Sequence, residues 1–313
     1  SVGAPGVLRM LAQAHAQHGK LPWASLFAPA IALAHQGFAM SPRLHAQLKA
    51  DAYLRLDPAA RAYFYQASGE PHAIGHVLRN PELAAVLQRI AVEGVQAFYQ
   101  GEVAEAVVRK VQQHPSNPGR LALSDLANYQ AKERTPVCFD HAAVSRVYRV
   151  CGFPPPSSGA IAIGQILGML QHTPASLMSS PTETADGTPD PRWLHLYTEA
   201  SRLAFADRAL YVADPDFVPA PSGEWQSLLA PAYLRERAKL IRPTAMPQAL
   251  PGTPVRAQRS SFAPMAAQPE FGTSHISIVD GWGNALAMTT TIEDAFGSRQ
   301  MVKGFLLNNE LTD

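Results

Sequence analysis

The sequence has little charge, few cysteines and no long apolar run, and each of these absences excludes a class of protein. Charged residues make up 16% of the 313 residues, and the formal net charge is +1 without any concentrated basic run. A nucleic-acid partner is not expected, because phosphate binding needs a concentrated basic face. No stretch reaches the roughly 18 apolar residues of a membrane helix. Hydrophobic residues make up 47%, so we expect a globular chain with a substantial core.

Sequence motifs for metals and cofactors are also missing. The sequence contains no CxxC, no HExxH and no glycine motif that cradles phosphate, so neither a metal nor a cofactor is expected. The two cysteines, Cys138 and Cys151, are too few for a zinc site or a disulfide scaffold. They flank a predicted hairpin with strands at 136–139 and 144–150 and a turn near 141–143. The two residues either form a disulfide in an oxidising compartment or remain buried thiols.

Most of the chain before residue 272 has the apolar spacing of helices. We expect helices that begin near Val7, Leu21, Pro42, Pro81, Gly94, Gly101, Leu123, Ile161 and Arg192. The segments 173–191 and 241–271 lack this periodicity and are rich in proline and small or polar residues. A structureless segment of about thirty residues in a compact protein tends to be functional or disordered. The second segment ends immediately before Thr273.

Three smaller groups of polar residues allow a structural and a functional interpretation. Ser157 and Ser158 precede an apolar helix, where serine ordinarily caps the helix, although a helix N-terminus also attracts anions. Asp214 and Asp216 surround a proline, which favours a turn over a metal site. Asp207 and Arg208 place an acid beside a base near the end of a predicted helix. We favour the cap and the turn.

The stretch from Gly272 to Asp313 contains the strongest candidate residues for chemistry. Thr273, Ser274 and His275 open an alternating strand, a Gly/Asn turn follows at 281–284, and a second strand over 285–292 returns the chain. This pattern predicts a hairpin in which Thr291 lies close to the start of the first strand. One interpretation is an active-site edge with a hydroxyl nucleophile and a hydroxyl partner. The other is an ordinary hairpin whose threonines reflect β-propensity, and spacing alone favours it.

Motifs along the whole chain resemble the γ-glutamyltranspeptidase family. In the C-terminal stretch they are Thr273–His275, Asp280, Gly283–Asn284, Thr289, Thr291–Glu293, Phe296–Gly297, Leu306–Glu310 and Asp313. Upstream they are Gly3–Gly6, Gly37–Phe38, Pro154–Gly159, Ala206–Arg208 and Asp214–Val218, in the family's order.

The resemblance implies an N-terminal-nucleophile hydrolase of the α+β class. Its fold would be an αββα sandwich of two mostly antiparallel sheets between helical layers, incomplete in this chain. Residues 1–272 would be the large-subunit portion and residues 273–313 the start of the small subunit, together in one structural domain. The precursor would cleave itself between Gly272 and Thr273. A freed α-amine, with an ordinary pKa of about 7.7–8.0, suits the role of general base for the Thr273 hydroxyl.

The resemblance also assigns roles to individual residues. Thr273 would be the nucleophile and Thr291 would orient it. Glu293, Glu310 and Asp313 would hold the α-ammonium of a γ-glutamyl group, and many relatives have Asn at the first of these positions. The substrate would be glutathione or another γ-glutamyl compound, and the acceptor water, an amino acid or a peptide. No cofactor is implied, and a periplasmic or secreted location is expected.

Two alternatives remain at this point. A cephalosporin acylase of the same family would use the same nucleophile on a glutaryl amide, which has no α-ammonium and therefore no need for Glu293 and Asp313. A homologue that has lost processing would have a binding or structural role, which the intact Thr273, Thr291 and Asp313 argue against.

The resemblance leaves part of the family's site outside these residues. The family's arginine for the substrate carboxylate would precede residue 1, and its serines and paired oxyanion glycines would follow Asp313. We therefore expect the sequence to be part of a longer protein. Without its oxyanion donors, the 313-residue chain alone is expected to be uncleaved and inactive.

Overall fold

A computed structural model describes residues 1–143, 146–177, 187–255, 262–265 and 272–312. Its contacts divide the chain into two compact units, one made of Ser1–Lys132 with Gln268–Asp313 and the other of Glu133–Ala267. The expectation that the chain forms a single structural domain stays a prediction. The proposed subunit boundary at Gly272–Thr273 follows cleavage chemistry rather than packing, and it stays a prediction.

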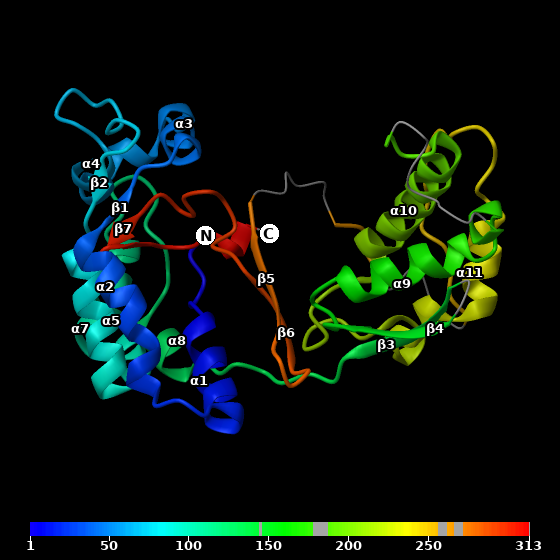
Figure 1. Cartoon of the computed structure of the whole chain (residues 1–313), viewed down its shortest axis with the longest axis horizontal. Coiled ribbons are helices and arrows are strands. Elements are labelled where there is room, and N and C mark those ends of the chain that lie inside the picture. The colour runs from blue at the N-terminus through cyan, green and yellow to red at the C-terminus, as the bar shows by residue number, and fades with distance from the viewer. Residues whose placement is uncertain (144–145, 178–186, 256–261, 266–271, 313) are drawn as a thin grey trace. The chain divides into compact units, whose positions relative to one another are not determined.

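The first unit is mainly helical (Figure 1). Its α-helices are α1 Val7–His18, α2 Ala28–Gln36, α3 Pro42–Ala50, α4 Pro58–Phe64, α5 Pro81–Glu93, α6 Gln96–Tyr99, α7 Gly101–Gln112 and α8 Leu123–Asn128. Short 3₁₀ turns lie at Trp23–Phe27, Leu54–Leu56 and Glu310–Thr312. The predicted starts at Pro42 and Pro81 are confirmed. In each case the preceding side chain, Ser41 or Asn80, accepts a hydrogen bond from a backbone N–H of the first turn.

Three short strand pairs complete the first unit. They are β1 Phe38–Ala39 with β2 Val77–Leu78, β5 Ser274–Val279 with β6 Ala285–Thr290, and β7 Met301–Val302 with β8 Phe305–Leu306. All three pairs are antiparallel.

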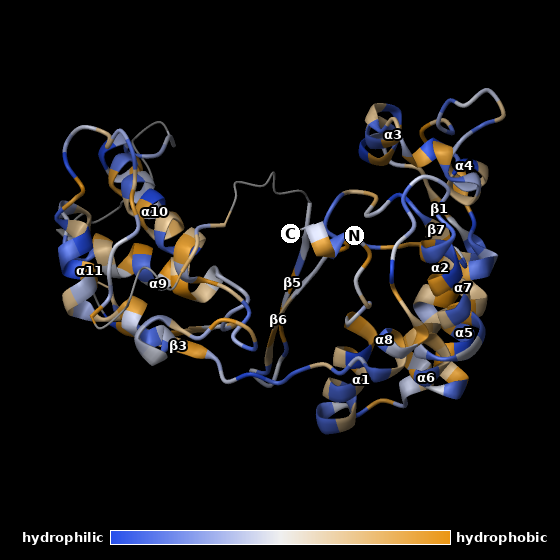
Figure 2. Cartoon of the chain, turned by 180° about the vertical axis from the view of Figure 1, so that it is seen from behind, coloured by the Kyte–Doolittle hydropathy of each residue, from blue (hydrophilic) through white to orange (hydrophobic). Residues whose placement is uncertain are grey.

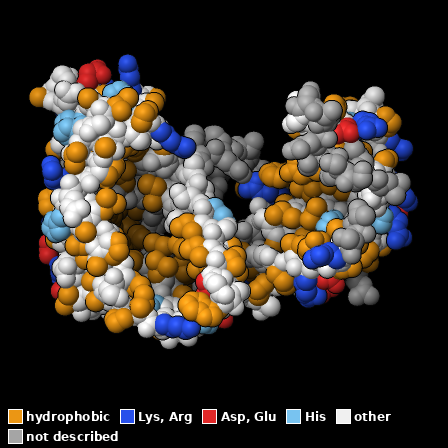
Figure 3. Space-filling model, viewed as in Figure 1, with side chains coloured by type: hydrophobic (Ala, Val, Ile, Leu, Met, Phe, Trp, Pro, Cys, Tyr) orange, Lys and Arg blue, Asp and Glu red, His pale blue; other side chains and the backbone are white. Residues whose placement is uncertain are grey.

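The C-terminal segment is packed into the helical core of the first unit. Leu307 is 1% exposed and lies in one apolar cluster with residues of α5, α6, α7 and α8. Phe296 and Met301 join a second cluster with Met40, Leu48, Leu54 and Phe64. Hydrophobic side chains also gather inside a hollow on this unit (Figure 3). Burial of these side chains fixes the segment that follows the β5–β6 hairpin, because each contributes about 1.5–3 kcal/mol.

In its described residues, the second unit combines a hairpin with three α-helices. The strands are β3 Val137–Ala142 and β4 Val147–Gly152, and the helices are α9 Gly159–Leu170, α10 Pro191–Tyr211 and α11 Pro231–Ala238. Short 3₁₀ turns lie at Pro174–Leu177, Pro221–Gly223 and Trp225–Leu229. The predicted hairpin is confirmed, with its second strand beginning later than expected. Cys138 pairs with Cys151 in the register, and the two form a disulfide with a Cα–Cα distance of 4.1 Å.

A buried carboxylate organises the second unit. Asp207 on α10 is 1% exposed and accepts hydrogen bonds from Gln165 of α9, Tyr233 and Arg237 of α11, and the Gly252 N–H. Its four donors, one of them the Arg237 guanidinium, compensate the cost of burying a charge. Asp207 therefore ties three elements together, and its proximity to Arg208 in the sequence is incidental to this role.

The structure confirms a mixture of helices and strands but does not display the predicted sandwich. Within the described residues the strands form four separate two-stranded sheets. The side chains of β5 are exposed on both faces, and Figure 2 shows hydrophobic and hydrophilic residues along this hairpin. In a sandwich, two stacked sheets each bury one face against the other. The exposed β5 side chains show no such stacking in the described residues. No helix in the described part of the chain combines the length and apolarity needed to cross a bilayer.

The disulfide should contribute measurably to the stability of the second unit. Replacing both cysteines, Cys138→Ser with Cys151→Ser, should lower its free energy of unfolding by about 3 kcal/mol, because a 13-residue separation is no longer closed in the unfolded chain. Urea denaturation followed by circular dichroism measures this loss. The parent protein in dithiothreitol should reproduce the variant, and equal midpoints for parent and variant would contradict the prediction.

Asp51 should make the free energy of unfolding of the first unit depend on pH. Burial opposes ionisation of Asp51, but hydrogen bonds from Leu54 N–H, Tyr53 N–H and Arg299 outweigh it and hold the Asp51 pKa below 3.8. A lowered folded-state pKa adds stability above pH 3.8, and this stability is lost as pH falls through the folded-state pKa. Asp51→Asn should therefore destabilise the protein more at about pH 7 than at about pH 2. Chemical denaturation across this range measures the difference, and a constant difference would refute the assignment.

Candidate functional site

The β5–β6 hairpin has the geometry that the sequence predicts. Its ladder pairs Ser274 with Thr290 and Val279 with Ala285. Asp280 closes the turn by accepting hydrogen bonds from the Trp282 and Asn284 N–H groups and from the Asn284 side chain. The Asn284 amide is the main cause of the lowered pKa of Asp280. β6 ends at Thr290, so Thr291 lies just beyond the ladder.

The hairpin brings Thr291 to the predicted cleavage site. The Thr291 hydroxyl donates to the Gly272 carbonyl oxygen at 3.3 Å, across 19 residues of sequence. The Thr291 hydroxyl oxygen in turn accepts the Glu293 N–H at 2.8 Å. Thr273 is exposed and follows Gly272 directly, so the carbonyl of the predicted cleavage site, the predicted nucleophile and the Thr291 hydroxyl belong to one region. This hydroxyl is also positioned to stabilise charge that develops on the Gly272 oxygen.

Glu293 lies in a backbone conformation that is unusual for its residue type. Its φ is +73°, in the left-handed region that favours glycine. Its carboxylate accepts a hydrogen bond from the Asn309 amide. Asn309 also donates its backbone N–H to Ile292 O at 3.2 Å. Because Glu310 follows Asn309, the structure brings together the segments that contain two of the three predicted ammonium ligands. The third, Asp313, lies outside the described residues.

His275 belongs to the surface of the hairpin. Its Nδ1 lies 2.8 Å from the Thr289 hydroxyl and its Nε2 3.1 Å from the Ser277 hydroxyl. Both ring nitrogens thus have partners on neighbouring strand positions. Such contacts are typical of a structural residue.

The smaller polar groups have structural partners. Asp214 accepts the Asp216 N–H at 2.9 Å, as a turn requires, and Arg134 forms ion pairs with both carboxylates. Ser158 is at the N-cap position of α9, but its side chain makes no capping hydrogen bond, so the predicted cap is wrong in that detail. Among the described residues, no group of three or more His, Cys, Asp or Glu side chains is arranged to hold a metal.

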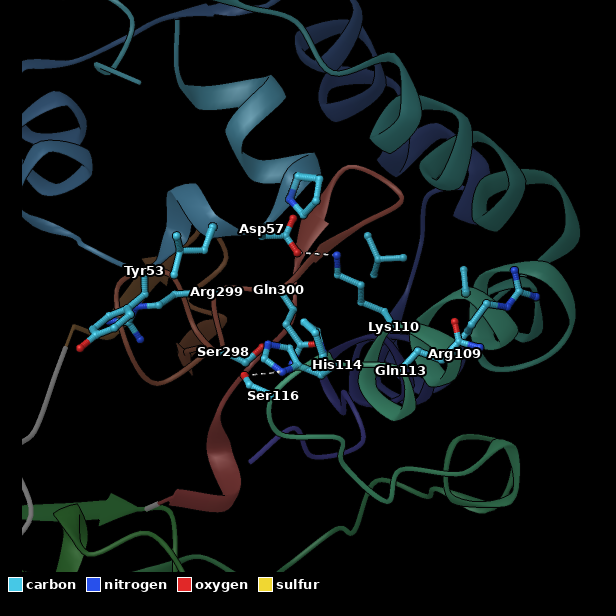
Figure 4. A pocket seen from close by; sticks show the side chains of 15 residues that line it. Tyr53, Asp57, Arg109, Lys110, Gln113, His114, Ser116, Ser298, Arg299 and Gln300 are labelled. Atoms are coloured by element: carbon cyan, nitrogen blue, oxygen red, sulfur yellow. Dashed lines mark hydrogen bonds and ion pairs between the residues drawn. The ribbon is translucent and has the colours of Figure 1, made fainter. Parts of the chain in front are cut away.

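Arg299 supports the segment beyond Glu293. It donates to Asp51 at 2.8 Å and to Asp294 at 2.7 Å, and the side chains of both aspartates are mostly buried. Arg299 also lines a cavity of about 630 Å³, together with Lys110, His114 and Gln300 (Figure 4). Thr273, Thr291, Glu293 and Glu310 do not line this cavity. Arg299 was not singled out from the sequence, because its two acidic partners are recognisable only in three dimensions.

Together these residues are suited to acyl chemistry beside carboxylates. The Gly272 carbonyl is followed by the residue with the predicted nucleophilic hydroxyl, Thr273, and receives a hydrogen bond from the Thr291 hydroxyl. One hydroxyl, that of Thr291, connects this carbonyl to the backbone of a carboxylate-bearing turn. Carboxylates attract an ammonium group, and a preorganised donor stabilises charge on a carbonyl oxygen.

Comparison with known proteins gives consistent relatives. The glutathione hydrolase proenzyme of Pseudomonas aeruginosa is 36% identical over 315 residues, which cover 100% of this chain and 51% of that relative. The γ-glutamyltranspeptidase structure from Helicobacter pylori aligns with a TM-score of 0.67 and 29% identity, covering 79% of this chain and 67% of that one. The cephalosporin acylase structure from Bacillus halodurans aligns with a TM-score of 0.76 and 27% identity, covering 98% and 52%.

The chain spans about half the length of the curated relatives that it matches. The family model described as Gamma-glutamyltranspeptidase matches residues 1–313, the whole of the sequence. The residues around Thr273 and Thr291 are among those that carry the resemblance in the sequence. The chain belongs to the γ-glutamyltranspeptidase family.

Proposed function

We propose that the protein is a γ-glutamyltranspeptidase, or glutathione hydrolase, that cleaves its own precursor between Gly272 and Thr273. The observation that carries this proposal is the hydrogen bond from Thr291 to the Gly272 carbonyl oxygen, directly beside Thr273. The Thr273 hydroxyl attacks the Gly272 carbonyl carbon, the C–N bond breaks, and the acyl group moves from nitrogen to oxygen. Water then hydrolyses the ester and leaves Thr273 with a free α-amine and Gly272 with a carboxylate.

The same hydroxyl performs turnover in the processed enzyme. The α-amine of Thr273 takes the hydroxyl proton as the oxygen attacks the γ-carbonyl of the substrate. The proton passes to the leaving amine, and a γ-glutamyl ester remains on Thr273. Water or the amine of an amino acid or peptide then attacks this ester and regenerates the enzyme.

Glu293, Glu310 and Asp313 hold the α-ammonium of the γ-glutamyl group. The position of Glu293 supports this role, because Thr291 links its backbone to the reacting carbonyl. The proenzyme name of the Pseudomonas aeruginosa relative agrees with a precursor that is processed. We assign glutathione or a related γ-glutamyl amide as the donor.

The finer architecture and the location are also proposals. Residues 1–272 belong to a large subunit and residues from 273 to a small one, and the exposed β5–β6 hairpin becomes part of an αββα sandwich in the whole protein. The Cys138–Cys151 disulfide supports an exported, periplasmic or secreted protein, because such bonds persist in oxidising compartments.

A glutaryl acylase is the second candidate. The similarity to the Bacillus halodurans cephalosporin acylase favours it, and the same nucleophile would serve. A glutaryl group lacks the α-ammonium, however, so it gives no reason for carboxylates at 293 and 310. We therefore prefer the γ-glutamyl substrate. A homologue without processing is less consistent with the contact between Thr291 and the Gly272 carbonyl.

The full-length protein should release the chromophore from a γ-glutamyl anilide faster than from the matching glutaryl anilide. Thr273→Ala should abolish both turnover and cleavage, since it removes the nucleophile of both reactions. Thr290→Ala, on the same hairpin, should retain both. Faster turnover of the glutaryl compound would support the acylase, and a parent protein that neither cleaves nor turns over substrate would support the inert homologue.

Thr291→Val should slow precursor cleavage by about a hundredfold, because it removes a donor to the carbonyl oxygen on which charge develops. The fraction of cleaved chain, followed by gel electrophoresis and N-terminal sequencing, measures this rate. Thr290→Val is the matched control and should cleave at the parent rate. Undiminished cleavage in Thr291→Val would show that this hydroxyl has no part in processing.

A further inference from the structure

The left-handed backbone conformation of Glu293 must be stabilised by contacts with its surroundings. A residue other than glycine at φ +73° costs about 1–3 kcal/mol unless its surroundings hold it there. The hydrogen bond from its N–H to Thr291 is one such restraint. This hydrogen bond restrains the Glu293 backbone, but it does not restrict the rotamer of the Glu293 side chain.

Asn309 supplies the remaining restraints. Its amide nitrogen donates to the Glu293 carboxylate and, at 3.1 Å, to the Thr312 hydroxyl. Its amide oxygen accepts the Asp294 N–H at 3.1 Å. Its backbone N–H donates to Ile292 O at 3.2 Å. Asn309 thus contacts the residue before Glu293, the residue after it and its side chain.

The chemistry of this contact requires an amide. One short side chain must donate to a carboxylate and accept from a backbone N–H, which asparagine does with its two ends. Aspartate would place a second negative charge against Glu293, and alanine would leave both groups without this partner. Asn309 is half-buried and follows Leu307 and Asn308, which are both buried. Burial of these two residues restrains the backbone that leads into Asn309.

We propose that Asn309 is a positioning residue for recognition of the substrate ammonium. It holds the Glu293 carboxylate in one orientation beside the segment of Glu310, so that the ammonium meets a preformed acidic site. This inference rests on the proposed γ-glutamyl substrate. It adds a residue that acts through Glu293 and does not itself contact the reacting atoms.

The test uses L-glutamate and glutarate, which differ only in the α-ammonium, as ligands of the full-length protein. Calorimetry gives both affinities directly, and inhibition of γ-glutamyl anilide turnover gives them independently. The parent should prefer L-glutamate. Asn309→Ala should reduce that preference by roughly 10- to 100-fold through weaker L-glutamate binding, with glutarate affinity unchanged.

The matched control is Asn80→Ala. Asn80 is 9% exposed, and its amide donates to the Gly304 carbonyl oxygen and accepts the Leu83 N–H. Its loss should therefore lower the melting temperature without changing the preference. In a double-mutant cycle, Asn309→Ala should have little further effect in a Glu293→Gln background. That result would show that Asn309 acts through Glu293.

Three results would overturn the proposal: equal weakening of both ligands in Asn309→Ala, additive effects in the cycle, or a parent without preference for L-glutamate. The first two, in a parent that turns over the γ-glutamyl anilide, leave the proposed function intact. A parent that prefers L-glutamate in calorimetry but turns over no anilide would instead count against the proposed activity.

Discussion

Burial of the C-terminal segment in the helical core of the first unit is the constraint on which the candidate site depends. Leu307 is 1% exposed among side chains of α5, α6, α7 and α8. Asn308 then bonds to Gly3 in both directions, and the two ends of the described chain lie side by side (Figure 1). The backbone of the next two residues, Asn309 and Glu310, is consequently anchored to the core. An acidic site built on this segment uses a rigid scaffold rather than a free loop.

The hairpin that follows the proposed nucleophile is attached differently. The β5 side chains are exposed, and the hairpin is held by its own ladder and by the turn at Asp280. Thr291 joins the two parts, because its hydroxyl reaches Gly272 on one side and the Glu293 N–H on the other. A single side chain therefore links the proposed cleavage site to the proposed ammonium site. The proposed processing and recognition share this geometric element.

The second unit is stabilised by means that have no evident part in the chemistry. Asp207 gathers donors from α9, α11 and the Gly252 backbone, while the disulfide fastens the β3–β4 hairpin. A buried charge of this kind demands several simultaneous partners, and removing one leaves the others uncompensated. Asp207, within one of the segments that carry the family resemblance, thus has a role in packing.

Local patterns in the sequence were sufficient for the hairpin, for the helix starts at Pro42 and Pro81, and for the residues that match the family. Their periodicity and caps act over a few neighbours, so they can be recognised without the fold. The choice between disulfide and thiols at Cys138 and Cys151, the core position of Leu307, and the roles of Asn309 and Arg299 were decided only by tertiary structure. Arg299 meets Asp51 across 248 residues of sequence, and Asn309 meets Glu293 across 16. Such pairings depend on how distant segments pack, and a pattern of near neighbours does not encode them.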